Sequence, residues 1–286
     1  MILVIPPYLR ANVCGVLCAL ALFVAALPAQ AQFDHTHAAW SALLKKHVVV
    51  LNDGRASQVR YGDFAKDRPA LKSYLDSVSK VGESEFKAWS KPQQMAFLIN
   101  TYNAYTIEKI LTRWPDLKSI RDFGTVFGNP WKDKFFTLFG KPAYLDQIEH
   151  EMLRAKGVYG EPRVHFAVNC ASIGCPMLRE EAYVPDRLDA QLEEQTRRFL
   201  MDRSRNHFNE QNGQLEVSKI FDWFKEDWQS GYTGIAAGTP INSREQFFAK
   251  YAKLLADKPD AQAKVVEQKA PLAFLEYDWG LNAARN

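Results

Sequence analysis

Apolar residues recur at helical spacing in several separate stretches of this chain. Apolar positions at i, i+3, i+4 and i+7 mark one face of an amphipathic helix. The clearest such helix begins at Ser90, which caps it, carries Pro92 in its first turn, and ends at Pro115. The same spacing predicts helices over residues 37–50, 69–78, 144–156, 187–202 and 243–255, with shorter ones from residue 84 and over 218–228.

Short β-prone runs lie between these helices. Asn212-Gly213 marks a hairpin turn between two of the runs. The predicted strands cover residues 58–61, 135–139, 163–168, 206–208, 214–217 and 274–279. No internal repeat, low-complexity tract or linker divides the sequence. The pattern therefore predicts a single α+β domain, rich in helix, with a small and mainly antiparallel sheet.

The N-terminal residues have the pattern of a secretory signal peptide. Arg10 is followed by an apolar run over residues 13–27, and Ala29-Gln30-Ala31 has the small-x-small form that a signal peptidase cleaves. The apolar run is short for a membrane-spanning helix, which needs about 20 residues. We therefore expect residues 1–31 to be a cleaved signal peptide, and the protein to be periplasmic or secreted with no stable membrane span.

Cleavage after Ala31 would leave one domain, residues 32–286, with its core over about 40–282. His35 and His37 would lie in a frayed tail at its start. The formal charge of the whole chain is only +3, which argues against nucleic acid as a partner. Aromatic residues make up 13% of the chain and indicate a well-packed globular domain. No specific partner is predicted.

The most informative segment is Val164–Pro176, which contains Cys170 and Cys175. The other two cysteines, Cys14 and Cys18, lie in the expected signal peptide. The remaining pair supports three chemistries. The first is a disulfide, because the expected compartment is oxidising and a turn can bring two cysteines so close in sequence within bonding distance.

The second chemistry is nucleophilic catalysis, which needs a base beside the thiol and a group that orients the base. Cys170 is the candidate nucleophile, and His165 or His150 is the candidate base. This would be a Cys-His-Asn type of site. The candidates for the orienting group are Asn100, Asn103 and Asp146.

The third chemistry is a structural zinc site. Its ligands would be Cys170 and Cys175 with His165 and His150, although their spacing is looser than that of common zinc motifs. A remaining interpretation is that the two thiols are free and only pack in the interior.

Two amides interrupt the apolar face of the helix predicted from Ser90 to Pro115. Asn100 and Asn103 lie three positions apart, although asparagine lowers helix propensity. One interpretation is that they hydrogen-bond to a neighbouring loop, since buried polar groups are normally paired. The other is that they line a pocket. The further candidates for such a pocket are Glu149, Asn169 and Ser172.

Five blocks of the sequence follow one another in an order typical of a known family. They are Phe97–Ile107 with Asn-x-Tyr-Asn-Ala, Leu145–His150 with Ile-Glu-His, Val164–Pro176 with His-Phe-Ala-x-Asn-Cys, Ile220–Phe224, and Tyr277–Asn282. Together they resemble the family named domain of unknown function 547. The resemblance implies that the first three blocks contribute to one polar pocket, and it implies a distant similarity to papain-like or transglutaminase-like folds. It implies no reaction, because the function of the family is not established.

These observations rank a non-enzymatic binding or structural module of the cell envelope first, with a polar pocket pinned by a Cys170–Cys175 disulfide. The alternatives are a cysteine-dependent hydrolase or acyl-transferase and a structural zinc-binding module. The sequence has no glycine-rich phosphate loop, no Gly-x-Ser-x-Gly and no His-Glu-x-x-His motif. Neither a cofactor nor a resident metal is predicted.

Overall fold

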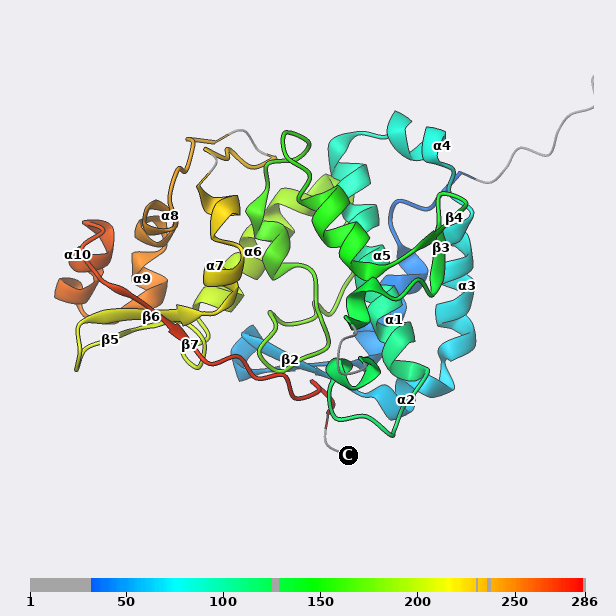
Figure 1. Ribbon diagram of the computed structural model, residues 1–286, viewed down its shortest axis with the longest axis horizontal. Helices are drawn as coiled ribbons and strands as arrows, with labels where there is room; N and C mark the ends of the chain where they lie inside the picture. The colour runs from blue at the N-terminus through cyan, green and yellow to red at the C-terminus, as the bar shows by residue number, and fades with distance from the viewer. Residues whose placement is uncertain (1–31, 125–128, 230, 236–237, 285–286) are drawn as a thin grey trace, which may run out of the picture. The chain divides into compact units, whose positions relative to one another are not determined.

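Helices and three small sheets make up the part of the chain that the computed structural model describes, namely residues 32–124, 129–229, 231–235 and 238–284 (Figure 1). The expected signal peptide, with Cys14 and Cys18, lies outside these residues. Residues 33–286 form one compact unit. Its helices and small, mainly antiparallel sheets confirm the predicted α+β class.

The long helix α5 (Lys91–Leu111) is buried along most of its length. Ser90 and Gln93 form a capping box at its start, which confirms the predicted N-cap. Helix α3 packs beside it, and α1 packs against α3 (Figure 1). The other α-helices are α1 (Ala38–His47), α2 (Tyr61–Lys66), α3 (Arg68–Ser79), α4 (Glu83–Ala88), α6 (Leu188–Leu200), α7 (Ile220–Trp223), α8 (Arg244–Lys250), α9 (Ala252–Leu255) and α10 (Pro259–Val266).

The strands form two hairpins and one three-stranded sheet. The hairpins pair β1 (Val48–Leu51) with β2 (Ala56–Val59), and β3 (Phe136–Leu138) with β4 (Lys141–Ala143), both antiparallel. In the third sheet, β6 (Gln214–Ser218) lies between antiparallel β5 (His207–Asn209) and parallel β7 (Leu272–Leu275). The hairpin predicted around Asn212-Gly213 is therefore confirmed.

One predicted helix ends earlier than expected and one predicted strand is wrong, and their neighbours explain why. The first helix ends at His47, because the β-branched residues that follow it pair with β2 instead. The strand predicted over 163–168 is the 3-10 helix η5 (Pro162–Phe166), whose first amide, on Arg163, is capped by the Glu161 side chain. All five residues of η5 are buried, the polar ones included. The alternation of apolar and polar residues therefore does not mark one buried and one exposed face, as it would in a strand.

Segments that were predicted as single helices are also divided. Residues 144–156 contain the π-helix η4 (Gln147–Leu153). Residues 218–228 form α7 and the 3-10 helix η7 (Lys225–Trp228), and residues 243–255 form α8 and α9. Short 3-10 helices also occur as η1 (Asn52–Gly54), η2 (Ile120–Phe123), η3 (Pro130–Lys132) and η6 (Pro185–Arg187).

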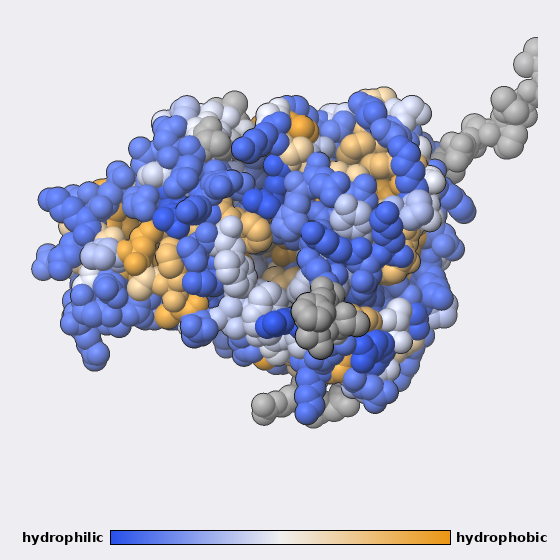
Figure 2. Space-filling model, viewed as in Figure 1, coloured by the Kyte–Doolittle hydropathy of each residue, from blue (hydrophilic) through white to orange (hydrophobic). Residues whose placement is uncertain are grey.

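The interior contains two clusters of apolar side chains. The first surrounds α1, α3 and α5, and the second lies between α6, α8 and the β5–β6–β7 sheet. On the surface, polar side chains cover most of one face, and apolar residues gather near the β5–β6–β7 sheet (Figure 2). The segment from η5 to Cys175 connects the two clusters, since Val164 packs in the first and Phe166 in the second.

A segment near the end of the chain, residues 277–284, crosses the loop that carries the cysteines. We call residues 277–284 the strap and residues 169–176 the cysteine loop. In Figure 1 the strap continues from β7 towards β2, and the Ala284 amide donates to the Val59 carbonyl. Backbone hydrogen bonds join loop to strap from Ile173 N to Gly280 O, from Gly174 N to Asp278 O, and from Asn282 N to Ala171 O.

The start of the described chain is packed rather than frayed. His37 is buried, and its Nδ1 atom lies 2.8 Å from the Tyr74 hydroxyl. The Phe33 ring centroid lies 5.2 Å from that of Phe97 in α5. The prediction of a frayed tail around His35 and His37 is therefore wrong, because His37 packs against Tyr74 of α3 and His35 packs against Trp89.

Candidate functional site

A cavity of about 240 Å³ opens beside the two cysteines. It is lined by six residues that the sequence indicates as catalytic or pocket candidates: Asp146, Glu149, His150, His165, Cys170 and Cys175. The cavity also has an aromatic wall made by Tyr102, Trp131, Trp223, Phe224, Tyr277 and Trp279. Thiols, carboxylates and imidazoles from separate parts of the chain therefore share one small space.

Cys170 and Cys175 are free thiols in this structure. Their Sγ atoms are 2.8 Å apart, whereas a disulfide bond is about 2.05 Å long. The Cys170 amide also donates to Cys175 Sγ at 3.0 Å. The disulfide predicted from the oxidising compartment is thus not formed here, and the two sulfur atoms make hydrogen bonds instead.

The two thiols have different surroundings. Cys170 Sγ lies 3.0 Å from Ser172 Oγ and 3.2 Å from the Tyr277 hydroxyl, and Ser172 Oγ lies 3.0 Å from the same hydroxyl. The hydrogen bond with Cys175 lowers the pKa of Cys170 most, and those with Ser172 and Tyr277 also lower it, to about 7. Burial, together with the adjacent Cys170, raises the pKa of Cys175 well above its usual value. Cys170 is therefore the thiol that ionises first.

This difference predicts the pH dependence of alkylation. Only the thiolate reacts with iodoacetamide, so the rate of Cys170 modification should rise with pH through a midpoint of about 7. An ordinary cysteine would show a midpoint of about 8.5. Tyr277→Phe removes one hydrogen-bond donor and should move the midpoint upwards. The rate is measured by mass spectrometry of the native protein. A midpoint at or above that of an ordinary cysteine would contradict the proposed hydrogen-bond network.

Carboxylates, not sulfur, lie next to the His165 ring. Its Nε2 atom is 2.7 Å from Asp227 Oδ2, and its Nδ1 atom is 3.8 Å from Glu149 Oε1. The ring stacks on Phe224, with centroids 4.2 Å apart. Burial lowers the pKa of His165, which favours the neutral ring. Among the described residues, no hydrogen bond joins an imidazole to either sulfur atom.

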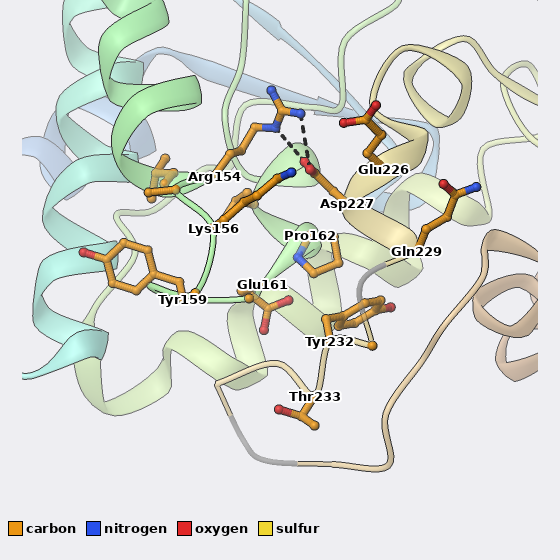
Figure 3. A pocket seen from close by; sticks show the side chains of 16 residues that line it. Arg154, Lys156, Tyr159, Glu161, Pro162, Glu226, Asp227, Gln229, Tyr232 and Thr233 are labelled. Atoms are coloured by element: carbon orange, nitrogen blue, oxygen red, sulfur yellow. Dashed lines mark hydrogen bonds and ion pairs between the residues drawn. The ribbon is translucent and has the colours of Figure 1, made fainter.

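Arg154 supports the His165–Asp227 pair from the opposite side. Its Nε atom donates to Asp227 Oδ2 at 2.6 Å, and its guanidinium lies 4.6 Å from the centre of the Phe224 ring. Burial opposes the charge on Asp227, but hydrogen bonds from His165 and Arg154 lower its pKa to about 2. Figure 3 shows this ion pair in the wall of a second cavity of about 580 Å³. Arg154 and Asp227 line this second cavity, whereas His150 and His165, to which they bind, line the cavity beside the thiols.

The π-helix η4 places Glu149 and His150 at the cavity. His150 Nδ1 accepts from Arg154 Nη1 at 2.7 Å, and His150 Nε2 lies 3.6 Å from Asp146 Oδ1. Asn129 donates to the other oxygen of Asp146 at 3.0 Å. Burial raises the pKa of Glu149. Helices of this type are rare and occur frequently at functional sites, and here the wider turn carries two polar residues of the cavity wall.

Asn100 and Asn103 lie behind the cavity wall, and their amides bind backbone groups. The Asn103 side chain donates to Ala167 O at 2.9 Å and accepts from Asn169 N at 2.8 Å. Asn100 makes the same pair of bonds with the carbonyl and the amide of Tyr183. These bonds fix two loops to α5, and that of Asn103 fixes the start of the cysteine loop.

Asn169 and Ser172 lie within the cysteine loop, outside the cavity lining. Asn169 is buried, accepts from Ala171 N at 2.9 Å and donates to Pro176 O at 2.8 Å, so it closes the loop on itself. Ser172 touches the cavity only through its bonds to Cys170 and Tyr277.

Several residues of the site carried no signal in the sequence. Asp227 and Arg154 belong to no recognisable motif. Trp223 and Tyr277 lie in two of the blocks that carry the family resemblance, but nothing in those blocks indicates that either residue lies near Cys170. The strap brings Tyr277 to the thiols, 107 residues after Cys170.

At Gly174 the cysteine loop and the strap approach so closely that a side chain would clash. A Cβ atom there would lie 2.9 Å from Asp278 N and 3.0 Å from Tyr277 Cδ1. Gly174→Ala should therefore push the strap away, lower stability by about 1–3 kcal/mol and raise the pKa of Cys170. Thermal unfolding and the pH profile of alkylation measure both effects. Gly82→Ala is the matched control, because no atom lies within 4 Å of a Cβ at that position. Equal behaviour of the two variants would show that the contact is unimportant.

No group of three or more His, Cys, Asp or Glu side chains is arranged to hold a metal ion within the described residues. His150, His165, Cys170 and Cys175 line one cavity without converging on a point. The structure therefore gives no support to the zinc alternative.

The helices of the described chain also include none with the length and apolar character needed to cross a bilayer.

Comparison with known proteins identifies a family but no function. Residues 86–200 match the model of a family described as "Protein of unknown function, DUF547". The match includes α5, η4 and the cysteine loop, but not Asp227 or the strap. No curated protein and no solved structure matches the chain, so the expected distant similarity to papain-like or transglutaminase-like folds finds no support.

Proposed function

Since residues 86–200 place this chain in the DUF547 family, whose function is unknown, we propose a function from the site itself: thiol–disulfide exchange by Cys170 and Cys175. One observation carries this proposal. Two free thiols stand 2.8 Å apart at the wall of an open cavity, and hydroxyl groups of Ser172 and Tyr277 bind Cys170. This asymmetry gives a nucleophile and a second thiol that can resolve the intermediate.

The reaction would proceed in two displacements. The Cys170 thiolate attacks one sulfur of a substrate disulfide, so that a mixed disulfide forms and the other half of the substrate leaves as a thiol. Cys175 then loses its proton and attacks Cys170 Sγ, which releases the second half of the substrate as a thiol. Two electrons pass to the substrate, and the protein is left with a Cys170–Cys175 disulfide. An external dithiol reduces that bond and completes the cycle.

The geometry favours exchange over hydrolysis. A thiol hydrolase or acyl-transferase, the alternative from the sequence, needs an imidazole that takes the proton of the nucleophile. His165 is instead held between Asp227 and Glu149, and His150 between Arg154 and Asp146. Hydroxyl and thiol groups stabilise the thiolate at Cys170 without a base.

A second candidate is the non-enzymatic binding module that the sequence ranked first. The aromatic wall of the cavity favours it, because small ligands bind in largely apolar pockets with a few polar groups. In that case a Cys170–Cys175 bridge would be permanent and would only pin the loop.

Oxidised glutathione distinguishes the two candidates. The reduced protein is incubated with it at neutral pH, alkylated with iodoacetamide, and weighed by mass spectrometry. Exchange predicts a protein lighter by two hydrogen atoms, without adducts, which returns to the reduced mass on addition of dithiothreitol under native conditions. A permanent bridge predicts a purified protein that is already oxidised and resists dithiothreitol until it unfolds. Thiols that react in neither test would exclude both.

We also propose that the protein is exported through a signal peptide over residues 1–31, as the Arg10, apolar-run and Ala-x-Ala pattern indicates. The chain recovered from the native cell envelope should then begin at Gln32. Recovery of a chain that begins at Met1, in the soluble fraction of broken cells, would exclude export. An oxidising compartment would supply the disulfides that this site exchanges.

A further inference from the structure

We infer that the cavity beside the thiols binds a protonated amine, so that its substrate is a small thiol or disulfide that carries an ammonium group. The cationic site stands on the cavity alone, whereas the sulfur chemistry of the substrate rests on the proposed function. Three features of the cavity wall lead to this inference: two enclosed carboxylates without a lysine or arginine partner, a set of aromatic faces, and the small volume.

The carboxylates of Asp146 and Glu149 face the cavity and are largely buried. Within the described residues, neither has a lysine or arginine nitrogen within 4.0 Å. Their ion-pair distances are 3.6 Å to His150 for Asp146 and 3.8 Å to His165 for Glu149. The arginine that is nearest in sequence, Arg154, is already bound to Asp227 and His150.

Buried carboxylates normally have a cationic partner, since an isolated buried charge is costly. Burial raises the pKa of Glu149, although His150, Arg154 and a hydrogen bond from Tyr102 oppose this shift. Cys170, which ionises near neutral pH, adds a third negative group to the same space. A cation that entered the cavity would therefore be attracted by all three groups.

Aromatic rings surround the same space. Trp223 is 43% exposed at the mouth and stacks on Trp279, with centroids 5.7 Å apart and planes at 27°. The ring centroids of Tyr277 and Trp131 lie 4.6 Å and 5.9 Å from that of Trp279. The faces of indole and phenol rings attract cations, and aromatic rings around a cavity are the usual means of recognising ammonium groups.

Two rings of this wall already hold cations of the protein. The Arg121 guanidinium lies 5.2 Å from the centre of the Trp279 ring, and that of Arg154 lies 4.6 Å from the centre of Phe224. Rings of this wall therefore already make cation–π contacts. A volume of about 240 Å³ is below the roughly 300–1,000 Å³ of pockets for drug-sized ligands, so an aminoalkyl group fits better than a larger ring system.

Protection of Cys170 tests the amine site without any redox reaction. Alkylation of the reduced protein by iodoacetamide is followed at pH 7 with added n-butylammonium, n-butanol or n-butyrate, at constant ionic strength. We expect saturable slowing, several-fold or more, by n-butylammonium and no saturable slowing by the other two. Equal protection by butanol, or none by butylammonium, would overturn the inference.

Two substitutions make the test specific. Glu149→Gln removes one charge at nearly constant shape, and we expect the half-protecting concentration of n-butylammonium to rise at least tenfold. Glu151→Gln is the matched control from the same π-helix, since Glu151 is exposed, binds Tyr144 and does not line the cavity. n-Butylammonium should protect Cys170 in Glu151→Gln at the same concentration as in the wild type. Thermal unfolding of both variants shows that they are folded, and an unchanged half-protecting concentration in Glu149→Gln would contradict the site.

Three symmetrical disulfides then separate this inference from the proposed function. Cystamine, bis(2-hydroxyethyl) disulfide and dithiodipropionate differ in charge, and their rates with the protein are divided by their rates with dithiothreitol. We expect the corrected rate to be highest for the cationic cystamine, lower for the neutral disulfide and lowest for the anionic dithiodipropionate. The first and the last should differ at least tenfold. Oxidation at equal corrected rates would leave exchange intact and reject the amine site. Protection by n-butylammonium without oxidation by any disulfide would retain the amine site and reject exchange.

Discussion

Replacing Cys175 with serine should trap the substrate on Cys170. With the second thiol absent, the mixed disulfide that forms after the first displacement has no internal nucleophile to resolve it. One glutathione should therefore remain attached to each chain after incubation with oxidised glutathione. Serine is nearly the size of cysteine, so the cysteine loop should keep its backbone hydrogen bonds to the strap.

The opposite variant gives the contrasting result. Cys170→Ser removes the thiol that ionises near neutral pH and leaves Cys175, whose pKa is raised by burial. We expect no glutathione adduct and no exchange with this variant under native conditions. Intact-protein mass spectrometry reads both results directly. If the two variants formed adducts to the same extent, the assignment of a nucleophile and a resolving thiol would be wrong.

Asn103→Ala in α5 should destabilise the protein strongly. The substitution leaves two buried backbone groups, the Ala167 carbonyl and the Asn169 amide, without their partner. Each unsatisfied buried group costs about 1–3 kcal/mol, so the free energy of unfolding should fall by about 2–6 kcal/mol. That is a large fraction of the roughly 5–15 kcal/mol by which domains are stable. The substitution should also release the start of the cysteine loop and slow the alkylation of Cys170 at pH 7.

Denaturant unfolding measures the stability change. Asn242→Ala serves as the control, because Asn242 is exposed and surface substitutions usually change stability by no more than about 0.5 kcal/mol. Alkylation of Cys170 at pH 7 measures the second effect. A loss below about 1 kcal/mol for Asn103→Ala would show that water or rearranged backbone replaces the amide.

The parts of the structure that could be predicted are those in which local interactions decide the outcome. The capping box of α5 is formed by residues three apart, and the hairpin turn at Asn212-Gly213 is equally local. Val48 marks the opposite case, because it continues the helical pattern of α1 but pairs with Val59 in β2. A distant partner decided its structure, and the pattern within α1 contained no information about it.

The candidate site was predictable only as far as its motifs extend. The family resemblance grouped His150, His165 and Cys170, and the structure places all three at one cavity. It could not indicate their partners, since Asp227 lies 62 residues from His165 and Tyr277 lies 107 residues from Cys170. The disulfide was inferred from the expected compartment. The hydrogen bonds of the two sulfur atoms depend instead on tertiary packing, which the spacing of residues along the chain does not reveal.

The strap has a consequence for the biosynthesis of the protein. Ribosomes complete the cysteine loop long before they reach Tyr277, which comes 107 residues later. Until then, the carbonyl groups of Asp278 and Gly280, which later accept from Gly174 and Ile173, do not exist. Until the strap is made, a nascent chain therefore lacks the hydrogen bond between Tyr277 and Cys170, which is one of those that lower the pKa of this thiol. Chains truncated before the strap would keep both thiols and the residues Cys175 and Ser172 that also bind Cys170, but the pKa of Cys170 should be higher than in the complete fold.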